Sequence, residues 1–254
     1  MRILILLMLT INYLIAKNNV LSVNDSIFSA RIERDQWGVP HIYGKRDADV
    51  SFGLAYAHAQ DDFATMEDVI FALRGELASI YGREAAVNDY YVHLMNYWGM
   101  VEERYESDVA DDVKLLCQGY AAGINRFLQD DPDLRKRSFD LVTAKDIIVG
   151  FSHRMPLMFG LDGVLKKLSK KKAPEFIGSS GDVQEGAFDM LASNVMAVGP
   201  QRSSDGYTRL WINTHQPWDG PVSWYEAHLV SEEGWDFFGG LFPGSPVPLI
   251  GHNT

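Results

Sequence analysis

The chain has 254 residues, of which 46% are hydrophobic and 22% are charged, a composition typical of a globular protein with a sizeable core rather than a disordered chain. Its formal net charge of -11 and pI near 5.0 argue against nucleic-acid binding, because proteins of that class present a basic surface to the phosphates. No nucleic-acid partner is therefore expected.

The N-terminal segment, Met1 to Ala16, has one arginine followed by an apolar run of about 14 residues. That run is too short to span a bilayer comfortably and has the length of a signal-peptide core. We interpret residues 1–16 as a signal peptide, with Leu14 and Ala16 as the best pair for cleavage; a buried core helix is the alternative. No cysteine lies near this site, so a lipoprotein is excluded. The expected location is periplasmic or secreted, with no stable membrane anchor.

The region 23–165 is predicted to be mainly helical after a short extended start. Residues 29–43 alternate between polar and apolar and then turn at Gly38 and Pro40, which is typical of two short strands joined by a turn. Apolar residues at three- and four-residue steps then predict a long amphipathic helix over 47–75, followed by another turn or two of helix.

Two more helices are predicted, over 107–130 and 143–159. The apolar residues of the second fall on one side and are Ile147, Ile148, Phe151, Met155 and Phe159. Cys117 lies in the first of them and is the only cysteine, so no intrachain disulfide can form. We interpret it as a buried core thiol, with a catalytic cysteine as the alternative.

Residues 166–192 are rich in lysine, glycine and serine and have few apolar anchors, which indicates a surface connector. The chain beyond it is β-rich. Four strands separated by Gly, Pro and Asp turns are predicted over 194–198, 207–213, 223–230 and 235–241. The first two flank the turn-rich segment 202–206 and predict a β-hairpin, which places Ser193 at the outer end of a buried strand.

The common catalytic motifs are missing from the sequence. It has no G-x-S-x-G elbow, no GxxxxGK[ST] phosphate loop, no H-E-x-x-H, and no Cys/His cluster at metal-ligand spacing. On these grounds alone, Ser193 would be an ordinary polar residue at the start of a strand.

Five segments together carry a family resemblance. They are RDQWGVPHIY (34–43), the helical stretch 53–82, GYAAGINRFL (119–128), SNVMAVGPQRSSDGYTRLWINTHQPW and its continuation (193–229), and PGSPVPLIGHN (243–253). In this order they resemble the penicillin acylase family of N-terminal-nucleophile amidohydrolases, which includes penicillin acylases and acyl-homoserine-lactone acylases. The resemblance implies an α+β fold of the αββα sandwich type, with a mainly helical α chain and a β chain that starts at residue 193.

The resemblance implies that the precursor cleaves itself between Ala192 and Ser193 and becomes an α/β heterodimer. The free α-amine of Ser193 would then act as the base for its own hydroxyl, which attacks the amide of an N-acylated small molecule such as a penicillin or an acyl homoserine lactone. No cofactor is required, and a structural calcium is compatible with the full-length protein.

The resemblance also implies supporting residues. Asn194 would help hold the new N-terminus, and His215 would support the nucleophile region, the alternative being a loop histidine that shapes a turn. The expected acyl-binding residues are Met155, Phe159, Leu249 and Ile250, with ordinary core residues as the alternative for all four.

Two departures from the family pattern are expected to matter. Ala192 stands where the family commonly has glycine before the nucleophile. The chain stops at Thr254, whereas family β chains continue and supply the oxyanion-hole asparagine and, in some members, calcium-binding aspartates. The chain is therefore expected to be a truncated and inactive product. The alternative is a non-catalytic periplasmic binding or interaction module, which would not need a free amine at Ser193.

Overall fold

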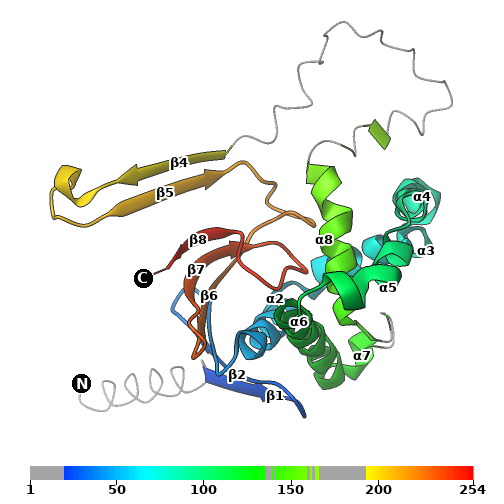
Figure 1. The fold of residues 1–254 in the computed structure, drawn as a ribbon, viewed down its shortest axis with the longest axis horizontal. Coiled ribbons are helices and arrows are strands. Elements are labelled where there is room, and N and C mark those ends of the chain that lie inside the picture. The colour runs from blue at the N-terminus through cyan, green and yellow to red at the C-terminus, as the bar shows by residue number, and fades with distance from the viewer. Residues whose placement is uncertain are drawn as a thin grey trace, which may run out of the picture.

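The structure is a computed structural model that describes residues 20–135, 139, 141–158, 161, 164–165 and 193–253. The predicted signal peptide (1–16), the predicted connector (166–192) and Phe159 lie outside the described residues. Figure 1 shows the helices gathered on one side of a sheet, with a long two-stranded hairpin projecting away from both. The described chain is a mixed α+β fold, as predicted.

The main sheet has six strands in the order β1-β2-β3-β6-β7-β8. Their bounds are β1 (Val20–Asn24), β2 (Ser29–Arg34), β3 (Pro40–Gly44), β6 (Tyr225–Ser231), β7 (Asp236–Leu241) and β8 (Ile250–Asn253). Neighbouring strands are antiparallel except β3 and β6, which pair in parallel. The β2–β3 hairpin and the strands β6 and β7 confirm the predictions, whereas β1 and β8 were not predicted. The sequence predicted a helical region followed by a separate β-rich region. In the structure, strands from both regions, β1–β3 and β6–β8, form one sheet.

Seven helices and two 3₁₀ turns are seen in the described residues. They are α2 (Asp47–Arg74), α3 (Leu77–Tyr81), η1 (Gly82–Ala85), α4 (Ala86–Met95), α5 (Tyr97–Asp108), α6 (Asp111–Asp130), α7 (Pro132–Arg135), α8 (Ala144–Met158) and η2 (Pro200–Arg202). Helices α2, α6 and α8 confirm the three predicted helices, and α4, α5 and the short α7 were not predicted. Helix α6 begins at Asp111 rather than at residue 107, because extended backbone at Val109 and Ala110 separates it from α5.

Helix α2 lies at the centre of the fold and differs from the predicted amphipathic helix. Every residue over 48–59 is buried, because the sheet covers one side of the helix and α6 covers the other. The helical geometry is interrupted at Asp62 (φ −150°, ψ 60°) and ends at Gly75, whose φ of 71° suits glycine. The predicted one-sided pattern holds only for the second half of this helix, where polar residues reach the surface.

Helix α8 also buries a different side from the one predicted. Ile147 is buried, but Phe151 and Met155 are 50% and 37% exposed. Two polar residues near the end of the helix, His153 and Arg154, are buried instead, and they hydrogen-bond to Asn88 and Pro243. None of the helices in the described part of the chain is both long and apolar enough to cross a membrane.

Strands β4 (Ser193–Val198) and β5 (Arg209–Thr214) form the predicted antiparallel hairpin. The prediction that β4 is buried is wrong for this structure. Among the described strands these two pair only with each other, and the hairpin projects from the body (Figure 1), so its large apolar side chains face solvent. Val195 is 69% exposed, Met196 59% and Trp211 53%.

Candidate functional site

Ser193 is the first residue of β4 and lies opposite Thr214 of β5, at the open end of the hairpin. It is exposed, and the residue before it, Ala192, lies outside the described residues. Strand geometry fixes which side chains share a face with it, because successive residues point to opposite sides. Ser193 and Thr214 are therefore on one face, and Asn194 and its partner Asn213 are on the other.

The second face brings together the two supporting residues that the sequence singles out. The Nε2 atom of His215 lies 3.5 Å from Asn194 Nδ2 and 3.3 Å from Asn213 Nδ2. If the two amides donate, the unprotonated Nε2 accepts both, and Nδ1 carries the imidazole proton. Asn213 was not predicted as a site residue. The signal was present in the sequence, because residues two apart share a strand face and Asn213 is two residues before His215.

The predicted acyl-binding residues lie on two other elements. Met155 is on α8, Leu249 precedes β8 and is 43% exposed, and Ile250 is the first residue of β8. Helix α8 contacts the loop that connects β7 to β8, because the buried guanidinium of Arg154 donates to the carbonyl of Pro243. Within the described residues, no hydrogen bond, ion pair or ring contact links Met155, Leu249 or Ile250 to the hairpin, and their role stays a prediction.

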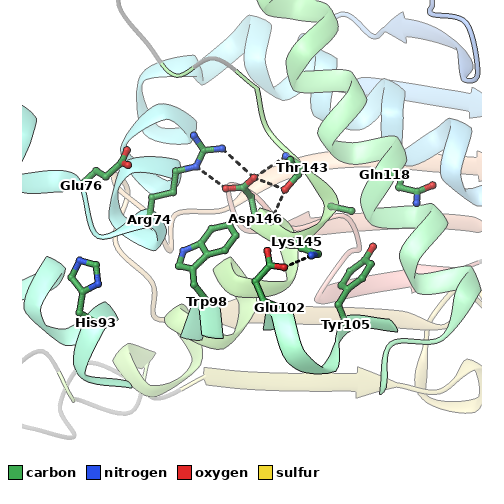
Figure 2. A pocket seen from close by; sticks show the side chains of 11 residues that line it. Arg74, Glu76, His93, Trp98, Glu102, Tyr105, Gln118, Thr143, Lys145 and Asp146 are labelled. Carbon is green, nitrogen blue, oxygen red and sulfur yellow. Dashed lines mark hydrogen bonds and ion pairs between the residues drawn. The ribbon is translucent and has the colours of Figure 1, made fainter. Parts of the chain in front are cut away.

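A large hollow in the described part of the chain lies elsewhere, among the helices (Figure 2). Its volume is about 880 Å³, and its lining residues are Arg74, Glu76, His93, Trp98, Glu102, Tyr105, Gln118, Thr143, Ala144, Lys145 and Asp146. None of the predicted site residues is in this lining.

Four charged groups of this hollow form two pairs, Arg74 with Asp146 and Lys145 with Glu102. Arg74 Nε donates to Asp146 Oδ1 at 2.7 Å, and the backbone N–H of Thr143 donates to Asp146 Oδ2 at 2.8 Å (Figure 2). Asp146 is 1% exposed and lies in the first turn of α8, so these bonds fix the start of that helix. Lys145 pairs with Glu102 at 2.5 Å. The arrangement supports a structural role for these residues rather than a reaction centre.

Three other groups have pKa values that burial has shifted strongly. Burial raises the pKa of the Cys117 thiol to about 12, which confirms a buried thiol and opposes the alternative of a catalytic cysteine, since a nucleophile needs a lowered pKa. Burial lowers the pKa values of His58 and His153 to about 4, so both imidazoles are neutral near pH 7. His58 stacks on Tyr225 with ring centroids 3.9 Å apart, and its Nδ1 has no partner among the described residues.

The described part of the chain holds no group of three or more His, Cys, Asp and Glu side chains arranged for a metal ion. The calcium that the resemblance allows for the full-length protein therefore stays a prediction.

The described residues form an α+β protein with Ser193 at the open end of a hairpin, beside a His–Asn cluster. Residues 29–254 match the model of the family described as penicillin amidase, and the chain belongs to that family. This confirms the resemblance recognised in the sequence.

Individual relatives agree with this membership. The chain is 29% identical to the acyl-homoserine lactone acylase PvdQ of Pseudomonas fluorescens, over 88% of this chain and 32% of the relative. It is 24% identical to the aculeacin-A acylase of Actinoplanes utahensis, over 91% of this chain and 33% of the relative. It therefore spans about a third of the length of these relatives. Among solved structures, a thermostable penicillin G acylase from Alcaligenes faecalis aligns with a TM-score of 0.44 at 18% identity, covering 61% of this chain and 100% of the other.

Proposed function

We propose that this chain is part of an exported amidohydrolase precursor that cleaves the amide of N-acylated small molecules through an N-terminal Ser193. The observation that carries the proposal is that Ser193 is the first residue of β4, in a chain that belongs to the penicillin amidase family. The names of the relatives, which include acyl-homoserine lactone and aculeacin-A acylases, favour substrates with an acyl chain on an amine. The periplasm or the extracellular space is the proposed location.

Maturation exposes the nucleophile. Ser193 Oγ attacks the carbonyl carbon of Ala192, the C–N bond breaks, and the acyl group moves to oxygen as an ester. Water hydrolyses this ester, which leaves a carboxylate on Ala192 and an amine on Ser193. The products are a noncovalent α/β heterodimer whose two chains share one sheet, because β3 precedes the cleavage point and β6 follows it.

Amide hydrolysis then uses the same residue twice. An α-amine has a pKa of about 7.7 to 8.0, so it is substantially neutral near neutral pH and takes the proton from Ser193 Oγ as this oxygen attacks the substrate carbonyl. The C–N bond of the substrate breaks, the proton passes to the leaving amine, and water hydrolyses the acyl-serine. Each tetrahedral intermediate needs oxyanion donors, whose individual loss costs about 3 to 4 kcal/mol in comparable enzymes.

The hairpin geometry favours the amine rather than His215 as the base. His215 contacts Asn194 and Asn213 on one strand face, whereas the side chain of Ser193 belongs to the other face. His215 and Asn194 are therefore supporting residues that hold the first residues of β4 in place. Met155, Phe159, Leu249 and Ile250 are proposed to contact the acyl group in the assembled enzyme, which adopts the αββα sandwich.

The test is to express the full-length gene and to determine the N-terminal residue of each product chain. We expect a new terminus at Ser193 and hydrolysis of an acyl homoserine lactone or a penicillin. Ser193→Ala should leave the precursor intact and inactive. Ser204→Ala, in the exposed turn of the same hairpin, is the matched control and should mature normally. An intact activity in Ser193→Ala, or a terminus at another residue, would refute the proposal.

A further inference from the structure

Strand β6 lies along the first half of helix α2 and is hydrogen-bonded to it at both ends. At one end of the strand, the Tyr225 hydroxyl donates to Asp61 Oδ2 at 2.6 Å. At the other end, Ser231 Oγ donates to Asp47 Oδ1 at 2.5 Å. Strand and helix therefore run in opposite directions. The two end bonds, as we call them, have the same chemistry, a hydroxyl of the strand and a carboxylate of the helix.

The spacing of the end bonds matches on the two elements. Asp47 and Asp61 are 14 residues apart, which is about 21 Å at the rise of an α-helix. Tyr225 and Ser231 are six residues apart, which is about 20 Å at the rise of a strand. A slip of the strand by two residues would move both hydroxyls by about 6.7 Å and break both bonds. The end bonds therefore specify one register of β6 on α2.

The surface between the end bonds is apolar. Ala227 and Leu229 lie on the same strand face as Tyr225 and Ser231, because strand residues two apart point to the same side. They are 1% and 0% exposed, and every residue of the helix over 48–59 is buried. Apolar burial is non-directional and does not by itself fix how far a strand slides along a helix. The directional hydrogen bonds at the two ends supply that information.

The bond at Asp61 is part of a small network. Arg34 Nη1 in β2 donates to the same Asp61 oxygen at 2.8 Å, so the carboxylate is held from two sides. Burial and then the Asp61 carboxylate raise the pKa of the Tyr225 phenol, which keeps its proton and remains the donor. The His58 ring stacks on the Tyr225 ring and fixes its orientation.

The bond at Asp47 is also reinforced. Ser231 Oγ accepts the backbone N–H of Trp235 at 3.0 Å, so its proton is directed to Asp47. The Glu233 carboxylate accepts the backbone N–H of Asp47 at 2.8 Å. Arg46 is at the N-cap position of α2, and its side chain has no acceptor for the first N–H groups of the helix. Glu233, from the turn after β6, supplies one instead.

We propose that the two end bonds hold the α and β chains together, and in register, once the bond before Ser193 has been cut, an inference that rests on the proposed function. Helix α2 precedes the cleavage point and strand β6 follows it. The end bonds are therefore contacts within one chain before maturation and contacts between two chains afterwards. The uncut connector keeps the two elements at a high effective concentration, and cleavage removes this advantage. From then on, the end bonds and the apolar strip between them decide how fast the chains separate.

The test uses the 254-residue chain with the recognition sequence of a specific endoprotease inserted in the connector 166–192. The folded chain is cut, and the release of the C-terminal piece from the immobilised N-terminal piece is followed over time. The cut does not need Ser193, so a chain that fails to cleave itself leaves the test intact. We expect the parent pieces to stay together, and Tyr225→Phe and Ser231→Ala each to dissociate about tenfold faster, since each loses a hydrogen bond to a charged group.

The double variant and two controls sharpen the test. The end bonds are about 20 Å apart, so their losses should combine to a rate about a hundredfold higher in the double variant. Tyr207→Phe and Ser204→Ala remove exposed hydroxyls of the hairpin and should dissociate like the parent. Parent pieces that separate at once, or a folded double variant with the parent rate, would overturn the proposal.

A surface variant carries the test if circular dichroism shows that the uncut double variant does not fold. Glu233→Ala removes only an exposed side chain and its bond to the Asp47 N–H, so release should be about threefold faster. Glu232→Ala is the matched control, because its exposed carboxylate has no hydrogen bond or ion pair within the described residues. Equal release rates in these two variants would contradict the proposal.

Discussion

The packing of α6 on α2 leads to a sharp prediction, because two glycines bring the helix backbones into direct contact. A Cβ atom added at Gly123 would lie 2.2 Å from the carbonyl oxygen of Phe52, and one at Gly119 would lie 2.2 Å from the carbonyl oxygen of Ala48. Ordinary contact begins at 3.4 Å, so each methyl group would have to move by about 1.2 Å. The obstructing atoms belong to the backbone of a helix that is buried all round and has no room to shift.

The magnitude follows from two opposing effects. Overpacking a close interface costs about 1 to 3 kcal/mol, and a contact with rigid backbone belongs at the upper end. Alanine has a better helix propensity than glycine by about 1 kcal/mol. We therefore expect Gly123→Ala to lower the free energy of unfolding by about 2 kcal/mol, and Gly119→Ala to act similarly.

The assay is urea unfolding followed by circular dichroism at 222 nm, with the slope of the transition checked for constancy. Gly99→Ala in α5 is the matched control, since the atoms nearest to the added Cβ belong to the side chain of Asn96, which can rotate away. That variant should be as stable as the parent or slightly more so. A Gly123→Ala chain that unfolds at the same urea concentration as Gly99→Ala would refute the account of the α2–α6 contact.

Two further predictions concern buried charge and acid. Asp146→Ala should lower the free energy of unfolding by about 3 to 5 kcal/mol in the same urea assay, because it leaves the Arg74 guanidinium without its buried partner. Lys145→Met removes an exposed ion pair and should cost less than about 1 kcal/mol. Equal losses in the two variants would contradict the structural role of the Arg74–Asp146 pair. The pKa values of His58 and His153 are lowered from 6.5 to about 4, so between these values the unfolded chain binds protons that the folded chain does not. Stability should fall as the pH drops from 6.5 to 4, by up to about 3 kcal/mol for each histidine, and His153→Gln should show a shallower dependence of the urea midpoint on pH.

The sequence predicted the elements whose signals are local. Helices α2, α6 and α8 repeat apolar residues at helical spacing over long stretches, and the hairpin β4–β5 has a turn between alternating runs. Strand β1 was missed because only Val23 of its five residues is buried, so almost no alternation marks it. Helix α5 was missed although Tyr97, Val101 and Tyr105, spaced four residues apart, form its buried stripe. The intervening charged residues concealed that pattern.

The side-chain contacts also differ in whether the local sequence predicts them. The contact between Asn194 and His215 follows from the register of a single hairpin, so it can be predicted from the local sequence. The pairing of His41 with His228 depends on the parallel alignment of β3 and β6, which no local pattern specifies. Long-range parallel pairing is set by how the buried faces of β3 and β6 pack together on α2, and that packing is visible only in three dimensions.

The hairpin explains why a strand that is predicted to be buried can be exposed here. Val195 and Ile212 lie on one face of the hairpin, and Met196 and Trp211 lie on the other, so both faces carry apolar side chains. A sheet that faces water on one side alternates apolar with polar residues, whereas strands covered on both sides are apolar throughout. The pattern of β4 and β5 is therefore that of strands lying between two layers. It supports the proposed αββα sandwich, in which a sheet is covered by helices on one face and by a second sheet on the other, and in which Ser193 would lie at the edge of a covered layer rather than in open solvent.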